Sequence, residues 1–137
     1  MYNNVKNEKN DKNEYFQNKY TFEQRLKEST NIKKKYPGKI PVIIQRTQKA
    51  LTDVPNIGKK KFLVPEDLEF CNLLFIVRKR LNLGTEKALY MFVNDKLIPS
   101  SKILNTIYDE EKNEDGFLYV HYASESTFGY KYALKKI

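Results

Sequence analysis

Cysteine is nearly absent from this chain, since Cys71 is the only one among its 137 residues. A single cysteine cannot form an internal disulfide, which argues against the class of small secreted domains that disulfides hold together. No stretch approaches the roughly 20 consecutive apolar residues of a membrane span, and the first residues lack the apolar segment of a signal peptide. These absences predict a soluble, cytoplasmic protein whose attachment to any membrane would have to be acquired.

Side chains suited to metal binding or catalysis are equally scarce. Histidine occurs once, at His121, and one histidine with one cysteine does not make a typical structural metal site. Cys71 and His121 could be a thiol nucleophile and its base, but a lone cysteine in an apolar helix is usually a small buried hydrophobic residue. No glycine-rich phosphate loop is present. We therefore expect no enzymatic activity, no catalytic residue, no metal and no cofactor.

The charge of the chain is unbalanced, with 25 Lys and Arg against 17 Asp and Glu, for a net charge of +8. A positive field favours acidic peptides, anionic lipids or nucleic acids as partners and does not choose among them. The 10 tyrosines and 8 phenylalanines could stack on nucleic-acid bases. Burial explains most of them better, because they fall in expected strands and helices, and no RNA-binding signature occurs. Nucleic acid is therefore not expected as a partner.

The length allows one domain with a hydrophobic core and is too short for two. Residues 1–14 are almost entirely Asn, Lys, Glu and Asp. Such a composition predicts a disordered tail, because it buries too little apolar surface to offset the entropy lost on ordering. The ordered part is expected to begin near Tyr15.

The pattern of apolar and turn-forming residues predicts a definite order of helices and strands. Thr21-Phe-Glu-Gln24 has the form of a capping box, and the helix that it begins ends at Tyr36-Pro37-Gly38. A first helix precedes it. Strands are expected at 40–44, 61–65, 89–93 and 117–122, further helices at 68–81 and 101–109, and a turn at 94–95. This order predicts an α+β domain of the ubiquitin-like β-grasp class, a four-stranded mixed sheet with two additional N-terminal helices.

The helix expected at 68–81 carries more apolar residues than one buried face needs. A core-facing stripe with the spacing i, i+4, i+7 and i+11 begins at Phe70 and includes Leu74. Leu73 and Ile76 are left over from this stripe. Either they widen the contact with the core or they belong to a site for a partner.

The strand expected at 61–65 ends in Pro65, which cannot donate to a ladder of hydrogen bonds, so we predict an edge strand. Lysines beside an edge strand, here Lys59, Lys60 and Lys61, commonly do no more than protect the edge against aggregation. Alternatively, an extended peptide adds itself to the open edge, and the lysines attract an acidic one. An open basic edge beside an apolar helix face favours a peptide groove.

Seven short motifs follow one another along the chain. They are Ile32-Lys-Lys-Lys-Tyr-Pro37, Ile40-Pro-Val-Ile43, Lys59-Lys-Lys-Phe-Leu-Val-Pro65, Arg78-Lys-Arg80, Ala88-Leu-Tyr-Met-Phe-Val-Asn94, Glu114-Asp115-Gly-Phe-Leu-Tyr119 and Ser124-Glu-Ser-Thr-Phe-Gly129. In this order and spacing they resemble the autophagy-related ubiquitin-like modifiers, the family of GABARAP and microtubule-associated protein light chain 3. The resemblance runs from about Tyr15 to Gly129 and implies a ubiquitin-like domain over residues 15–129.

The resemblance implies that the domain recognises a short acidic motif: an aromatic residue, two residues of any kind, then Leu, Ile or Val. It places the pocket for the aromatic residue at Glu28, Ile32, Pro41, Ile43, Lys61, Leu63 and Phe117. It places the pocket for the aliphatic residue at Phe62, Val64, Pro65, Leu68, Leu73 and Ile76, with Arg80 at its rim. Strand alternation agrees with this division, since Lys61 and Leu63 point one way and Phe62 and Val64 the other.

The resemblance also gives Gly129 a covalent role. A processing cysteine protease would cut after Gly129, which is flanked by Phe128 and Tyr130, and so remove the extension at 130–137. The activating and conjugating enzymes of the autophagy system would then join Gly129 to phosphatidylethanolamine. The protein would pass in this way from the cytoplasm to autophagosomal or vesicle membranes and recruit receptor and adaptor proteins there.

The residues that follow Tyr122 show no apolar periodicity, so residues 123–129 are expected to form an extended, accessible arm. Glycine suits the end of such an arm, because it has no Cβ and its carbonyl is open to attack. A ubiquitin-like adaptor that binds peptides and is never conjugated is the alternative function.

Overall fold

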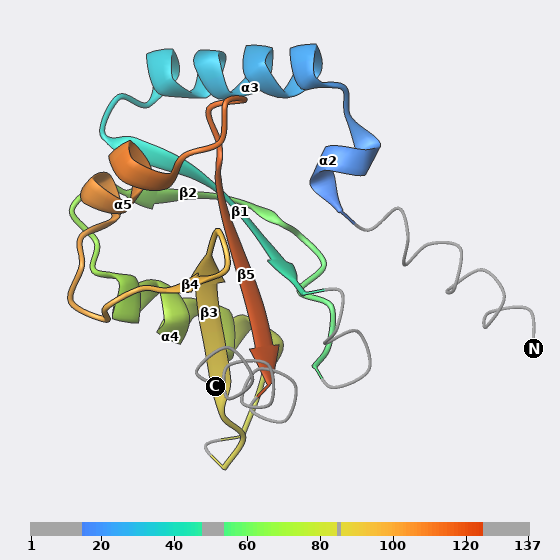
Figure 1. The fold of residues 1–137 in the computed structure, drawn as a ribbon, viewed down its shortest axis with the longest axis vertical. Helices are drawn as coiled ribbons and strands as arrows, with labels where there is room; N and C mark the ends of the chain where they lie inside the picture. The colour runs from blue at the N-terminus through green and yellow to red at the C-terminus, as the bar shows by residue number, and fades with distance from the viewer. Residues whose placement is uncertain (1–14, 48–53, 85, 125–137) are drawn as a thin grey trace, which may run out of the picture.

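The computed structural model describes residues 15–47, 54–84 and 86–124. Within them a five-stranded mixed sheet is accompanied by four helices (Figure 1). The predicted tail at 1–14, the residues Phe128, Gly129 and Tyr130, and the extension that follows lie outside the described residues.

Two helices precede the sheet, as predicted: α2, Phe16–Lys19, and α3, Phe22–Lys35. The capping box of α3 is present in full. The backbone N–H of Gln24 donates to Oγ1 of Thr21 at 3.2 Å, and the N–H of Thr21 donates to Oε1 of Gln24 at 2.9 Å. Each bond satisfies a donor that the first turn of a helix would otherwise leave free, which fixes where α3 begins.

The strands are β1, Lys39–Arg46; β2, Lys61–Pro65; β3, Leu89–Val93; β4, Lys96–Leu97; and β5, Leu118–Ser124. Their order in the sheet is β2-β1-β5-β3-β4. The central pair, β1 and β5, is parallel and the other pairs are antiparallel. The sheet is therefore mixed, and β2 lies at its edge as Pro65 predicts.

The predicted number of strands was wrong, because the sheet has a fifth strand, β4. Asn94 and Asp95 form the predicted turn with φ angles of 51° and 62°. They close a hairpin in which Val93 pairs with Lys96, and positive φ at both turn residues is the geometry that two-residue hairpins favour. A strand of two residues is too short to show an alternating pattern in the sequence.

The end of β5 also differs from the prediction. Ala123 pairs with Tyr90 and Ser124 with Leu89, and both residues are almost fully buried. The expectation of an accessible arm from Ala123 onward was therefore wrong for these two residues, because pairing with β3 continues the strand. The rest of the expected arm lies outside the described residues.

Helices α4, Phe70–Leu81, and α5, Leu104–Glu111, each begin two or three residues later than predicted. The stripe that α4 buries passes through Leu73, which is fully buried, whereas Leu74 is only half-buried. The predicted stripe through Leu74 was therefore wrong, and of the two interpretations left open for Leu73 the structure supports the contact with the core. No helix within the described ranges is long and apolar enough to cross a bilayer.

Residues of β1 alternate between two hydrophobic clusters, one on each face of the sheet. Ile40, Val42 and Ile44 belong to the larger cluster, which α4 and α5 complete. Ile43 belongs to a smaller cluster with Phe16 of α2 on the opposite face. In Figure 1, α3 lies on the side away from α4, so the layer beneath α3 is separate from the main core.

Candidate peptide-binding groove

A hollow of about 570 Å³ lies between α3 and the edge strand β2, and we call it the α3–β2 groove. Its lining side chains come from α3, from β2 and the residues before it, and from the end of α4: Glu28, Ile32, Lys59, Lys61, Phe62, Leu63 and Arg80. Four of them were predicted for the aromatic pocket, two for the aliphatic pocket, and Lys59 for the basic edge. The fold thus brings residues of both predicted pockets to one hollow beside a strand edge.

The floor of the α3–β2 groove is supplied by β1. Ile43 lies opposite Lys61 in the ladder and Pro41 opposite Leu63, and side chains of directly opposed residues share a face of the sheet. Ile43 and Phe117 are fully buried, Pro41 is also buried, and Ile32 packs against the same cluster. Ile43, Pro41 and Phe117, three residues of the predicted aromatic pocket, are therefore buried and are not among the residues that line the groove.

The rim of the groove carries charge. The ammonium group of Lys61 donates a hydrogen bond to the carboxylate of Glu28, which joins β2 to α3 across the hollow. At the other side, the guanidinium of Arg80 lies 5.5 Å from the centroid of the Phe62 ring, within the range of a cation–π interaction. Both cations remain close to the surface, where they can meet an acidic ligand.

The residues predicted for the aliphatic pocket are divided by the fold. Phe62 and Arg80 line the groove, whereas Val64 and Leu73 belong to the main core. Pro65 and Ile76 are exposed, and Leu68 is half-buried against the core. Strand alternation holds, since Phe62 packs against the main core together with Val64 while Leu63 on the other face is 40% exposed.

A buried polar network fixes α3 over the sheet and so fixes one wall of the groove. Asp115, fully buried, accepts hydrogen bonds at Oδ2 from Arg25 and from the Tyr119 hydroxyl, each at 2.5 Å. Its Oδ1 accepts from the N–H of Phe117 at 2.9 Å, and its carbonyl accepts from Ser29 at 2.5 Å. Burial raises the pKa of Tyr119, and the hydrogen bond to Asp115 raises it further. The phenol therefore stays protonated and keeps donating.

Sequence reasoning did not find this network. The sequence presents Asp115 only as one residue of the Glu114-Asp115-Gly-Phe-Leu-Tyr119 motif. The one available signal was the adjacent Glu114-Asp115-Gly116 turn before an apolar strand, where Gly116 has a φ of +86°. A side chain added at Gly116 would lie 2.3 Å from Oγ of Ser29, so glycine permits the close approach of this loop to α3.

A comparison with known protein families identifies the family of this chain. Residues 24–129 match the family described as "Autophagy protein Atg8 ubiquitin like". The chain belongs to the Atg8 family.

Known Atg8 proteins align with the chain over most of their length. It is 48% identical over 117 residues to autophagy-related protein 8c of Arabidopsis thaliana, which covers 85% of this chain and 97% of that protein. It is 45% identical over 114 residues to autophagy-related protein 8 of Schizosaccharomyces pombe, covering 83% and 93%. The crystal structure of Trypanosoma brucei ATG8 is similar with a TM-score of 0.77 at 36% identity, over 83% of this chain and 97% of that one.

Membership of the Atg8 family confirms the resemblance and the ubiquitin-like α+β fold that were predicted from the sequence. It makes the chain a ubiquitin-like protein of autophagy, with partners and a location in the autophagy system. Cys71 and His121, the only cysteine and histidine of the chain, are not among the residues that line the α3–β2 groove.

Cys71 lies on α4 and is half-exposed, so the expectation that it is a buried hydrophobic residue was wrong. His121 lies on β5, with its ring stacked on Phe92 at 6.2 Å and its Nε2 at 3.4 Å from the amide nitrogen of Gln45. Burial lowers the pKa of His121 below its ordinary value. Within the described residues, no group of three or more His, Cys, Asp or Glu side chains could hold a metal ion.

Proposed function

We propose that this Atg8-family chain is a ubiquitin-like modifier that is joined through Gly129 to phosphatidylethanolamine on autophagosomal membranes. There it recruits receptor and adaptor proteins that carry acidic aromatic-x-x-aliphatic motifs. It is not an enzyme, and it moves from the cytoplasm to autophagosomal or vesicle membranes when lipid is attached.

The α3–β2 groove is the observation that carries the recruiting half of the proposal. Its lining offers apolar surface at Ile32, Phe62 and Leu63, and cations at Lys61 and Arg80. The adjacent edge strand offers backbone groups to which an extended peptide can add itself as a further strand. An acidic peptide with two apolar anchors satisfies all three features together.

The position of Gly129 supports the conjugating half. The family match ends at Gly129, and this residue follows the last residue of β5 by five positions. After protease cleavage, ATP adenylates the glycine carboxylate with release of pyrophosphate, and an enzyme thiol displaces AMP to form a thioester. The amine of phosphatidylethanolamine then attacks the carbonyl, an amide forms and the thiol leaves. Two acyl chains then anchor the domain to a bilayer.

The eight residues after Gly129, at 130–137, support a second candidate function. If no protease removed them, the carboxylate of Gly129 would never be exposed, and the chain would act as a free adaptor that binds the same peptides. The two functions share the α3–β2 groove and differ only in the fate of Gly129.

The groove is tested with the double variant Lys61→Ala/Leu63→Ala and a peptide that has an acidic flank and a Phe-x-x-Leu core. We expect calorimetry to give a micromolar dissociation constant for the wild type and at least a roughly tenfold weaker one for the variant. The matched control is Lys96→Ala/Leu97→Ala at the opposite edge of the sheet. It also removes an ion-paired lysine and an exposed leucine. Equal binding by both folded variants would rule out the α3–β2 groove as the site.

A further inference from the structure

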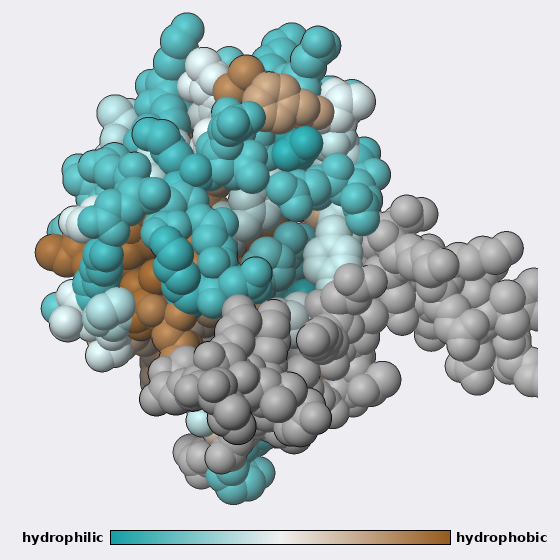
Figure 2. Space-filling model, in the orientation of Figure 1, coloured by the Kyte–Doolittle hydropathy of each residue, from teal (hydrophilic) through white to brown (hydrophobic). Residues whose placement is uncertain are grey.

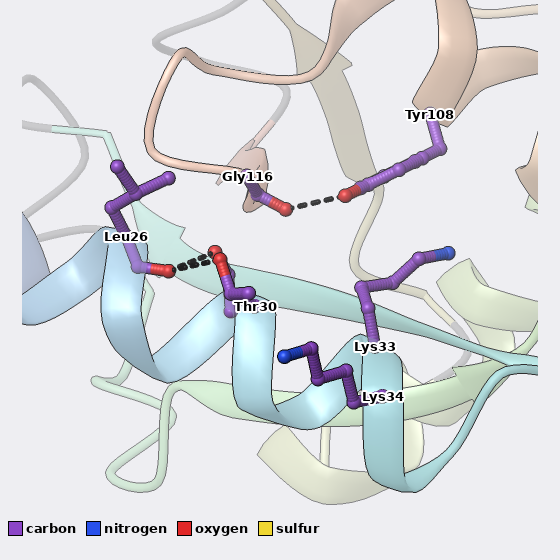
Figure 3. Close-up of a pocket in the computed structure, with 7 residues that line it drawn as sticks. Leu26, Thr30, Lys33, Lys34, Tyr108 and Gly116 are labelled. Carbon is purple, nitrogen blue, oxygen red and sulfur yellow. Dashed lines mark hydrogen bonds between the residues drawn. The ribbon is translucent and has the colours of Figure 1, made fainter.

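A second hollow, of about 330 Å³, lies on the other flank of α3, and we call it the α3–α5 hollow (Figure 3). It is bounded by α3, by Tyr108 of α5 and by Gly116 in the loop before β5. It shares no lining residue with the α3–β2 groove. Because successive residues of a helix are about 100° apart, Leu26 and Lys33 point away from the flank that carries Glu28 and Ile32. The α3 helix therefore separates two independent sites.

Two lysines, Lys33 and Lys34, line this hollow, and a third, Lys112, lies near the Tyr108 ring that bounds it. Nζ of Lys33 lies 4.8 Å and Nζ of Lys112 lies 5.2 Å from the centroid of the Tyr108 ring, and Lys34 lines the hollow beside them. In the part of the chain that the structure describes, none of the three is ion-paired with a carboxylate, whereas Lys61, Lys96 and Lys102 are. Like charges held together repel one another, so an anion placed among them is stabilised by all three.

The ring of Tyr108 lies near two of these cations, Lys33 and Lys112. Its hydroxyl donates to the carbonyl of Gly116 at 2.6 Å (Figure 3). Burial, together with the charges of Asp109 and Asp115, raises the pKa of the phenol. The ring therefore stays neutral. The carboxylate of Asp115 is already hydrogen-bonded to Arg25 and Tyr119, so it does not act as a counter-ion for these lysines.

The opposite end of the hollow is apolar. Leu26 lines it and is 39% exposed, and Phe22, one turn earlier on α3, is 42% exposed. Figure 2 shows a small apolar patch over α3, surrounded by hydrophilic surface. A ligand for this hollow is thus expected to combine an apolar group at one end with negative charge at the other.

We propose that the α3–α5 hollow is a second peptide-binding site, which takes a short acidic segment of a partner protein. An aliphatic side chain of the segment packs on Leu26, and its neighbouring carboxylates face Lys33 and Lys34, with Lys112 near the same ring of Tyr108. Such a site would let one chain engage two segments at once, one on each flank of α3.

Other occupants fit less well. A second copy of the chain carries a net charge of +8 and would be repelled. The N-terminal tail at 1–14 has three lysines balanced by three acidic residues, so it brings no net negative charge. An anionic bilayer also offers negative charge, and the vesicle titration described below distinguishes it from a peptide. The hollow lies next to the start of β5, and the end of β5 that leads to Gly129 is roughly 20 Å of strand away. Attachment of lipid at Gly129, as proposed above, would therefore leave the hollow uncovered.

The test uses the full-length, unconjugated chain, so its outcome does not depend on conjugation. The probe is a blocked Asp-Glu-Leu-Asp-Glu peptide, which lacks an aromatic residue and therefore should not occupy the α3–β2 groove. In nitrogen-15 NMR titrations we expect shifts of the amides of Thr30 and Gly116, and none at Phe62 and Leu63. Affinity in the range of about 0.1 to 1 mM is expected for so short a segment.

The deciding variant is Lys33→Gln/Lys34→Gln, and its matched control is Lys27→Gln/Lys35→Gln on the same helix. Lys27 and Lys35 line neither hollow. We expect roughly five- to tenfold weaker binding for the first pair and less than about a twofold change for the second. Unchanged binding of the Phe-x-x-Leu peptide by both variants shows that the fold is intact.

Three results would overturn the proposal: shifts confined to the α3–β2 groove, equal losses in both variants, or no shift at all. A parallel titration uses vesicles of phosphatidylcholine with phosphatidylserine. If these vesicles bind through Lys33 and Lys34 while the peptide gives no shift, the site takes lipid headgroups and the peptide proposal is wrong.

Discussion

The ammonium group of Lys61 on β2 is hydrogen-bonded to the carboxylate of Glu28 on α3, so an ion pair spans the α3–β2 groove. The two side chains are 42% and 33% exposed. Pairs as exposed as this one contribute only about 0–1 kcal/mol to stability, because water screens them. An acidic ligand can therefore take Lys61 from Glu28 at little cost, and the pair acts as an internal competitor for the ligand's carboxylate.

Replacing Glu28 with glutamine should tighten the binding of an acidic Phe-x-x-Leu peptide by roughly two- to fivefold, since Lys61 is then free for the ligand. The side chain of phenylalanine has no N–H to donate to Glu28, so the aromatic side chain of the ligand loses no hydrogen bond in return. The free energy of unfolding should change by less than about 1 kcal/mol. Calorimetry measures the affinity. Glu110→Gln, which breaks the Lys102–Glu110 pair on α5, should leave it unchanged, and weaker binding by Glu28→Gln would contradict this account of the pair.

Two neighbouring residues of α4 should respond very differently to truncation. Leu73 is fully buried, and Leu73→Ala should lower the free energy of unfolding by about 2–5 kcal/mol, because it removes packed methyl groups and leaves a cavity. Ile76 is 39% exposed, and Ile76→Ala should cost less than about 1 kcal/mol. Urea denaturation measures both. A cost below about 1 kcal/mol for Leu73→Ala would show that this side chain is not part of the core.

The case of Leu73 also shows where sequence reasoning stops. Spacings of three and four residues both return to one face of a helix, so Leu73 and Leu74 serve equally well in a stripe that begins at Phe70. The rotation of α4 against the sheet decides between them, and that rotation depends on packing partners far away in the sequence. Ile76, one turn from Leu73, is 39% exposed, so for this residue the interpretation as part of a partner site stays open.

Features with a local cause were predicted well. The Thr21–Gln24 capping box fixes the start of α3, and the Lys61–Pro65 and Leu89–Val93 strands have the predicted bounds. Features that depend on a partner strand or helix were missed. The two-residue strand β4 exists only because β3 lies beside it, and the α3–α5 hollow exists only because Tyr108 is brought against Lys33.

His121 should make stability depend on pH near neutrality. Above its ordinary pKa of 6.5 the imidazole is neutral in both the folded and the unfolded protein. Burial lowers the pKa in the folded state, so as the pH falls below 6.5 the unfolded protein takes up a proton that the folded protein resists. The free energy of unfolding therefore decreases as the pH decreases below 6.5, by up to about 1.4 kcal/mol per pH unit from this one group.

The variant His121→Phe keeps a ring beside Phe92 and removes the titrating group. Urea midpoints compared at about pH 7.5 and about pH 5.5 should fall less in the variant than in the wild type. Carboxylates titrate in both proteins alike, so the difference between the two proteins in the pH-dependent change of the urea midpoint isolates the contribution of His121. An identical change in both proteins would mean that His121 takes up its proton equally well in the folded and the unfolded protein.

The central claim is that Gly129 becomes the point of attachment to lipid, and the intact mass of the protein recovered from its own cells tests it most directly. Wild-type protein from washed membranes should have lost residues 130–137 and gained one phosphatidylethanolamine, while Gly129→Ala should remain in the soluble fraction without lipid and still bind the Phe-x-x-Leu peptide. Wild-type protein that keeps residues 130–137 throughout, or a Gly129→Ala protein that still carries lipid, would contradict the claim.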